Sequence, residues 1–199
     1  MPDYTKEHMH ALIRFGLRMW QELRDSGRYE AVLFFKNYGP FSGGTIRHPH
    51  MQLVGLPHVR RELLCLPEEF GGPVIAERDG VTLNVSAVPR VGFWEFNVVP
   101  ETLTGKAIDT LADFIQITVD YLSRHFFTST NSYNIFFYEF DGRIAVKLLP
   151  RFATPPIYVA TASASARAAS PPSSTRCKSS TLQRNDKAPL PPARAASFR

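Results

Sequence analysis

Two imidazoles and a carboxamide occur at alternate positions in the first third of the chain. His48, His50 and Gln52 take every second position, and Pro49 and Met51 lie between them. Because side chains alternate across a β-strand, the three polar groups are predicted to share one face of an extended segment. Such groups must be hydrogen-bonded, exposed or used in chemistry. A neutral imidazole can attack phosphorus and form a phosphohistidine-type intermediate, so the pattern indicates phosphoryl transfer.

A glycine-rich loop, residues 37–44, precedes the histidines. Gly39, Gly43 and Gly44 allow the backbone to approach an anion closely, and consecutive amides there can form an anion-binding nest. Gln52 can hydrogen-bond phosphoryl oxygens without acting as a general acid or base. The loop and the polar strand together therefore predict a phosphate site.

An isolated His-x-His is usually a surface pair or a metal-ligand coincidence, and this alternative applies here only if the loop, the strand register and the glutamine are all accidental. The remaining four histidines are expected to be structural or surface residues: His8, His10, His58 and His125.

Two amphipathic helices and several short strands are predicted to position these groups. A helix over residues 5–25, capped by Thr5, has an apolar face at three- and four-residue spacing: Met9, Leu12, Ile13, Gly16, Trp20 and Leu23. A helix over residues 105–126 has a similar stripe: Ile108, Leu111, Ala112, Ile115, Val119, Leu122 and Phe126. Strands are predicted over residues 31–35, 46–55, 82–87, 91–98, 132–140 and 143–149, with a short helix or irregular connection over 59–70 and a turn at Asp141-Gly142.

This order of elements predicts an α+β fold of two related units, residues 1–72 and 73–159, although no internal repeat is strong enough to establish the relation. Residues 160–199 are rich in Ala, Ser, Pro and Arg. Such a segment cannot bury enough apolar surface to offset its ordering entropy, so a disordered tail is expected.

The positive charge belongs to the tail. The chain of 199 residues has a net charge of +5, but residues 160–199 hold seven of the 23 Lys and Arg and only one acid, Asp186. The remainder is close to neutral, which argues against nucleic-acid binding by the body.

No apolar run is long enough to span a bilayer, and no secretory signal opens the chain. Cys65 and Cys177 form no Cys-x-x-Cys pair, so a reducing, cytoplasmic setting is expected.

Residues 37–52 resemble the active-site segment of galactose-1-phosphate uridylyltransferase and its relatives in the histidine-triad (HIT-like) superfamily. In that family an Asn, a Gly and a small hydroxyl residue precede the His-Pro-His-x-Gln motif at fixed distances and contact the nucleotide phosphates. Those offsets fall on Asn37, Gly43 and Thr45 in this sequence, and Gly44 adds a further amide.

The resemblance also assigns roles to the motif itself. It implies that His50 is the nucleophile, that His48 is a metal or structural ligand or contacts the nucleotide, and that Gln52 binds phosphate. Histidine-triad hydrolases carry a third histidine where this chain has Gln52, so transfer rather than hydrolysis is implied. The fold implied is an antiparallel HIT-like sheet with flanking helices in two units, the second without a catalytic histidine.

A bacterial branch of this superfamily with no assigned function is similar over about residues 4–159. The segments that carry this similarity are 35–40, 42–55, 90–97, 132–138 and 147–152. Relatives usually begin with a Cys-x-x-Cys metal motif and further strands that this sequence lacks. We therefore expect a first unit shortened at its N-terminus, with zinc binding lost or weakened and no metal site among these residues. The change of composition after Val159 favours a reading-frame change over a selected binding arm.

The predicted function is transfer of a nucleoside monophosphate group, uridylyl or adenylyl, from a nucleotide or nucleotide-sugar phosphate through His50. A nucleotide-binding protein without turnover is the first alternative, and an interaction protein acting through its basic tail is the second. No membrane or nucleic-acid partner is expected. The resemblance is compatible with a homodimer.

Overall fold

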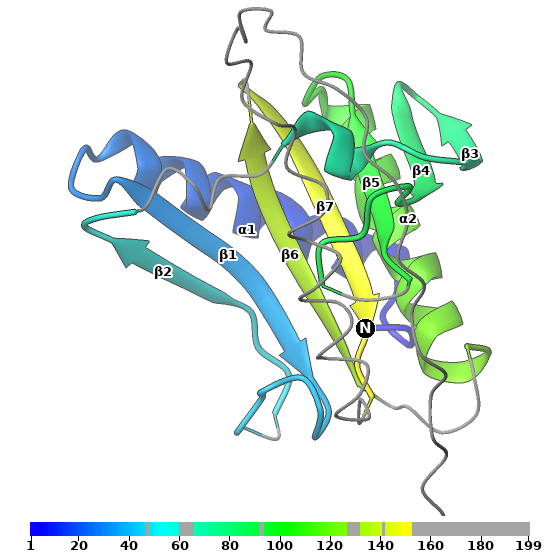
Figure 1. Ribbon diagram of the computed structural model, residues 1–199. Coiled ribbons are helices and arrows are strands. Elements are labelled where there is room, and N and C mark those ends of the chain that lie inside the picture. The colour runs from blue at the N-terminus through cyan, green and yellow to red at the C-terminus, as the bar shows by residue number, and fades with distance from the viewer. Residues whose placement is uncertain (47, 60–65, 92–93, 127–131, 141, 153–199) are drawn as a thin grey trace, which may run out of the picture. The chain divides into compact units, whose positions relative to one another are not determined.

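A computed structural model describes residues 1–46, 48–59, 66–91, 94–126, 132–140 and 142–152, all within one compact unit, Met1–Thr154 (Figure 1). The predicted tail, residues 160–199, lies outside the described residues. Within the described ranges, no helix has both the length and the apolar character needed to cross a bilayer.

The described residues form a seven-stranded antiparallel sheet and two long helices (Figure 1). The helices are α1 (Lys6–Asp25) and α2 (Gly105–Arg124), and a 3-10 turn, η2, spans Pro67–Phe70. The strands are β1 (Ala31–Tyr38), β2 (Gln52–Leu56), β3 (Val74–Arg78), β4 (Val81–Val85), β5 (Phe96–Pro100), β6 (Tyr133–Phe140) and β7 (Arg143–Pro150). Their spatial order is β2-β1-β6-β7-β5-β4-β3. The predicted α+β class with an antiparallel sheet and flanking helices is confirmed.

Helix α1 forms where its apolar face and its cap predicted it. The Thr5 side chain accepts a hydrogen bond from the His8 backbone amide, which satisfies one of the free amides at the helix start. The buried residues are Met9, Ile13, Gly16, Leu17 and Trp20. Leu12 and Leu23, which were also expected on this face, are only partly buried.

Both helices cover the same face of the sheet, so the core lies between them and that face (Figure 1). The Phe34 and Phe137 rings stack with centroids 4.1 Å apart, joining β1 to β6. Trp20 on α1 donates its indole hydrogen to the Val32 carbonyl at 2.6 Å. A side chain at Gly16 would meet the Phe34 ring, because an added Cβ would lie 2.5 Å from it.

The other face of the sheet carries a buried polar cluster around Lys147. Its ammonium lies 2.8 Å from a Glu95 carboxylate oxygen and donates to the Glu69 carbonyl at 2.6 Å and to Asn97 at 2.9 Å. Lys147 and Glu95 have no exposed surface. A buried charge requires such partners, and this cluster attaches η2 to β5 and β7.

The main correction to the predicted strands concerns residues 46–55. The strand β2 begins only at Gln52, so His48 and His50 lie in an extended loop before it rather than on the strand. Pro49 has no amide hydrogen and so could not continue the ladder with β1. The predicted strand over residues 46–55 was therefore wrong for the segment that holds the two histidines.

The other differences are smaller. β1 is three residues longer than expected, and β5 begins at Phe96 rather than residue 91. The edge strand β3 was not predicted. Of the connection expected over residues 59–70, η2 is described, while residues 60–65 and Asp141 of the predicted turn lie outside the described residues.

Candidate functional site

The glycine-rich loop begins where β1 ends. Gly39 and Gly43 have φ angles of 82° and 79°, in a region that residues with a Cβ rarely adopt. Ser42 closes the turn between them, since its amide and its hydroxyl both donate to the Gly39 carbonyl, at 3.3 and 2.8 Å. The Gly44 amide donates to the Ser42 hydroxyl at 3.2 Å. The local sequence therefore fixes a compact turn.

The distant strand β6 holds this loop in place. The buried Asn134 side chain donates to the Asn37 side-chain oxygen at 2.6 Å and to the Ser42 carbonyl at 3.0 Å. The Phe41 amide donates to the Ser132 hydroxyl at 3.3 Å. Residues about 90 positions apart in the sequence thus build one loop geometry.

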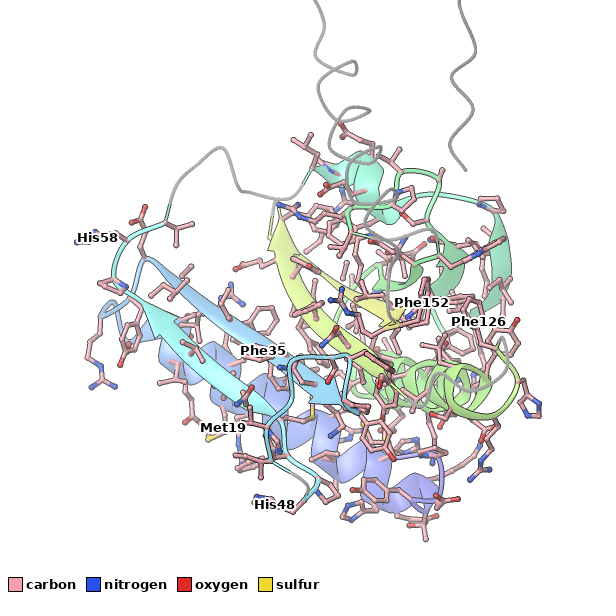
Figure 2. The ribbon with its side chains drawn as sticks, turned by 60° about the horizontal axis from the view of Figure 1, so that its bottom comes forward. Met19, Phe35, His48, His58, Phe126 and Phe152 are labelled. Carbon is pink, nitrogen blue, oxygen red and sulfur yellow. The ribbon has the colours of Figure 1, made fainter. Side chains whose placement is uncertain are left out.

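The two motif histidines are joined by a side-chain to backbone hydrogen bond. Nδ1 of His50 lies 2.9 Å from the His48 carbonyl oxygen. Because a carbonyl can only accept, Nδ1 must carry the hydrogen, and in the neutral ring Nε2 then holds the free electron pair. The centroids of the two rings are 5.7 Å apart. In Figure 2, His48 lies near one end of β2 and His58 lies near the other end. This arrangement leaves Nε2 of a neutral His50 ring with its electron pair unshared.

A cavity of about 600 Å³ lies beside the motif. It is lined by Lys36, Asn37, Tyr38, Gly39, Pro40, Gly44, Thr45, Ile46, His48 and Pro49. Its volume is in the range of sites for small molecules and cofactors. One of its aromatic residues, Tyr38, stacks on the buried Tyr133 with ring centroids 4.9 Å apart. Burial raises the pKa of Tyr133, so that phenol stays protonated.

The structure brings four of the predicted site residues together in this lining: Asn37, Gly44, Thr45 and His48. Gly43 is exposed and lies outside the lining, and Gln52 lies in β2 opposite Phe35. His50 also lies outside the lining but has its ring next to that of His48.

Sequence reasoning missed Lys36. Its side chain is only 3% exposed, and its ammonium donates to the His50 carbonyl oxygen at 3.0 Å. Burial lowers the pKa of Lys36. The signal was available in the alternation of β1, where Val32 and Phe34 occupy the same face and are buried.

In the part of the chain that the structure describes, no three His, Cys, Asp or Glu side chains are grouped as metal ligands. His48 is exposed and its ring faces that of His50. A single imidazole does not fit a structural zinc site, which takes four ligands. Loss of zinc binding stays a prediction, and metal analysis of the purified protein tests it.

Comparison with known proteins gives matches over most of the chain. Residues 1–59 match the N-terminal domain, and residues 64–168 the C-terminal domain, of the family described as domain of unknown function DUF4931. A crystal structure of a DUF4931 family protein from Bacillus cereus is 39% identical, with a TM-score of 0.73, over 80% of this chain and 72% of that one. A search of the curated proteins found no match.

More distant structures share the fold. One is a uridylyltransferase mutant, 17% identical with a TM-score of 0.62, matched over 80% of this chain and 66% of its own. Another is an ADP-glucose phosphorylase from Arabidopsis thaliana with bound ADP-glucose, 16% identical with a TM-score of 0.60, matched over 79% of this chain and 60% of its own. The predicted likeness to galactose-1-phosphate uridylyltransferase-like proteins is thereby confirmed at the level of the fold. The chain belongs to the DUF4931 family, a branch of that fold.

Proposed function

We propose that this protein transfers a nucleoside monophosphate group through a covalent bond to His50. The observation that carries the proposal is the 2.9 Å contact between His50 Nδ1 and the His48 carbonyl, which leaves Nε2 as the nucleophilic atom. The adjacent cavity offers room for a nucleotide phosphate.

The reaction has two displacement steps. In the first, Nε2 of His50 attacks the α-phosphorus of a nucleotide sugar, an N–P bond forms, and the bond to the bridging oxygen breaks. The electron pair leaves on the sugar phosphate. In the second, a phosphate oxygen of the acceptor attacks the same phosphorus, and the N–P electron pair returns to Nε2. Nδ1 keeps its hydrogen throughout, held by the His48 carbonyl.

The loop would supply phosphate contacts in both steps. The backbone amide of Gly43 and the Thr45 hydroxyl are the proposed donors, while Gly44, whose amide donates to the Ser42 hydroxyl, would hold the shape of the loop. Asn37, whose side-chain oxygen is already bonded to Asn134, has its amide group available as a donor. His48 and Gln52 are proposed to contact the nucleotide on either side of His50.

A nucleotide sugar is the proposed donor because structural relatives include uridylyltransferases and an ADP-glucose phosphorylase with bound ADP-glucose. The transferred group would be uridylyl or adenylyl. These relatives share the fold at low sequence identity, so experiment must identify the base of the nucleotide.

A second candidate function is nucleotide binding without transfer. The observation that favours it is the position of His50 outside the cavity lining. The two candidates differ in whether a covalent intermediate forms.

Incubation with UDP-glucose or ADP-glucose carrying a label on the α-phosphate separates them. We expect an acid-labile, base-stable label on the protein, absent in His50→Ala, and transfer activity reduced by about three orders of magnitude or more in that variant. His58→Ala is the matched control, because His58 is exposed at the far end of β2 (Figure 2). Nucleotide binding by the unaltered protein without any such label would favour the second candidate.

A further inference from the structure

Lys36 is a buried cation at the wall of the candidate site. Its side chain is 3% exposed, it lies on β1 one residue before Asn37, and it lines the cavity. Its ammonium has three hydrogens, of which one is given to the His50 carbonyl at 3.0 Å. Among the described residues no second acceptor is hydrogen-bonded to this ammonium, so two hydrogens are left for a ligand.

Lys147, which is also buried, shows what a purely structural lysine looks like in this fold. Lys147 has a carboxylate at 2.8 Å, from Glu95, and two further oxygens within 3 Å. No carboxylate of the described residues forms an ion pair with Lys36. Burying a charge without a counter-ion is costly. An anion that is present only in the complex would compensate the charge.

We infer that Lys36 is a phosphate-binding residue, whose ammonium contacts the phosphate oxygens of the nucleotide while it holds the backbone of His50. This inference rests on the proposed function, and it adds a residue that the His-Pro-His-x-Gln pattern does not include. A cation in a water-poor site stabilises a charged phosphate more strongly than one in water.

The groups that face Lys36 favour an anion. Burial and the nearby Lys36 charge lower the pKa of the Met1 amine, and the Tyr38 ring lies 5.9 Å from the Lys36 ammonium. From the loop, the contact is the neutral carbonyl of His50, with His48 on the same cavity wall. Because no negative charge among these groups neutralises the ammonium, the net field at this wall attracts phosphate.

Binding of nucleotides and their nucleosides tests the inference directly. We expect Lys36→Met to bind UMP and AMP at least tenfold more weakly than the unaltered protein, with little change for uridine and adenosine. Lys36→Arg should recover part of the loss, since it restores a cation. Lys106→Met, which removes an exposed lysine far from the loop, should bind all four ligands as the unaltered protein does. Isothermal titration calorimetry at fixed salt measures each affinity.

Folding of the variant is checked by urea denaturation. We expect the Lys36→Met midpoint to be no lower than that of the unaltered protein, because a buried charge is removed. A lower midpoint with equal losses for nucleosides and nucleotides would make Lys36 structural and overturn the inference. Unchanged UMP and AMP affinities in Lys36→Met would also overturn it, while leaving the proposed function intact. If the unaltered protein forms no label on His50 and binds neither nucleotide, the proposed function itself fails.

Discussion

At the scale of single residues, the site depends on groups that lie outside the recognisable motif. Asn134 is 97 positions from Asn37, yet its amide group bonds both to that side chain and to the Ser42 carbonyl. In the proposed reaction the motif supplies the reacting groups, and β6 supports the loop that precedes them.

Replacing this support should loosen the loop. We expect Asn134→Ala to lower the free energy of unfolding by about 1–3 kcal/mol, because two partners lose a buried hydrogen bond. It should also raise the KM for nucleotide sugar more than it lowers kcat, since His50 itself is not touched. Urea denaturation and labelling kinetics measure the two effects. Asn84→Ala, which removes a buried asparagine on the distant strand β4, is a matched control for stability. Equal changes in KM for both variants would refute a specific role for Asn134.

Residue types and spacing were enough to find the motif but not its surroundings. The histidines and Asn37 could be identified because polar groups at fixed offsets are rare by chance. The alternation of β1 marks Lys36 as buried, but which groups Lys36 and Asn134 contact depends on segments that are distant in the sequence. The spacing of residues along one segment does not show which distant segment it will pair with.

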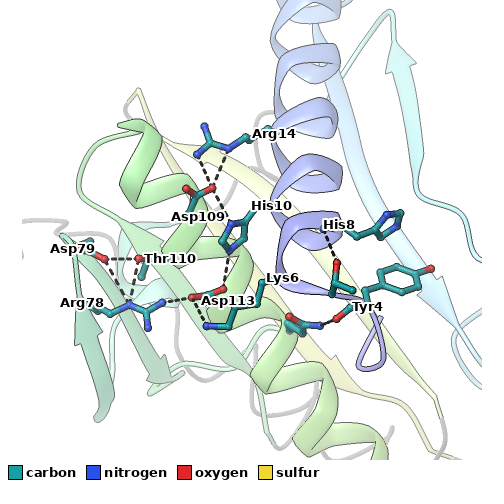
Figure 3. Close-up of polar contacts among 12 residues, drawn as sticks. Tyr4, Lys6, His8, His10, Arg14, Arg78, Asp79, Asp109, Thr110 and Asp113 are labelled. Carbon is teal, nitrogen blue, oxygen red and sulfur yellow. Dashed lines mark hydrogen bonds and ion pairs between the residues drawn. The ribbon is translucent and has the colours of Figure 1, made fainter.

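At the scale of elements, a polar network joins α1 to α2 and α2 to β3 (Figure 3). The Asp113 carboxylate on α2 is hydrogen-bonded to the His10 ring of α1 at 2.8 Å and to the Arg78 guanidinium of β3 at 2.5 Å. Arg14 of α1 contacts Asp109 of α2 at 2.6 Å. The prediction that His10 is structural agrees with this position. Three elements that are distant in the sequence are thus held by charged side chains at the rim of the core.

The ionisation of Asp113 makes this network sensitive to acid. Burial opposes the charged form, but the hydrogen bonds from His10 and Arg78 and the charge of Lys6 outweigh it, so the pKa of Asp113 lies below its ordinary value. A carboxyl with a lowered pKa stabilises the fold above its unfolded pKa of about 4, and this stability is lost as pH falls through the folded pKa.

Asp113→Asn should therefore lower the free energy of unfolding by about 1–3 kcal/mol at pH 7. The difference from the unaltered protein should begin to shrink as the pH falls below about 4, where the carboxyl of the unfolded chain is protonated, and should be lost below the folded pKa of Asp113. Urea denaturation across this range measures it. Asp120→Asn on the same helix is the control, because its pairs with Arg124 and His125 are more exposed and should contribute less than about 1 kcal/mol. A pH-independent difference for Asp113→Asn would contradict the assignment.

The elements also differ in how far they could be predicted. Both helices follow from apolar stripes, and their ends fall within two residues of the predicted positions. β3 was missed because Val74, Ile75 and Glu77 are all exposed on an edge strand, so no alternation marks it. The start of β2 was placed too early because pattern alone does not show where a partner strand stops pairing.

At the scale of the described unit, the two regions of the family share one sheet. Residues 1–59 contribute α1, β1 and β2, while the remaining strands and α2 belong to the region from residue 64 onward. β1 pairs with β6 from Phe34 to Tyr38, and α1 packs against α2. The division into two related units, residues 1–72 and 73–159, stays a prediction. Because the two family regions share one sheet, a separate question is whether these regions unfold together.

We expect one cooperative unfolding transition for both regions. The protein has two tryptophans, and Trp20 on α1 is buried while Trp94 is about half exposed. Trp94→Phe therefore leaves Trp20 as the sole fluorescence reporter of the first region. Its urea transition should coincide with the loss of hydrogen-exchange protection in peptides from α2 and β7, because separating β1 from β6 would expose Phe34 and Phe137 to water. If Trp20 becomes exposed at a lower urea concentration while α2 and β7 remain protected, the two regions unfold independently. The loop that β6 supports would then lose its geometry before the rest of the fold.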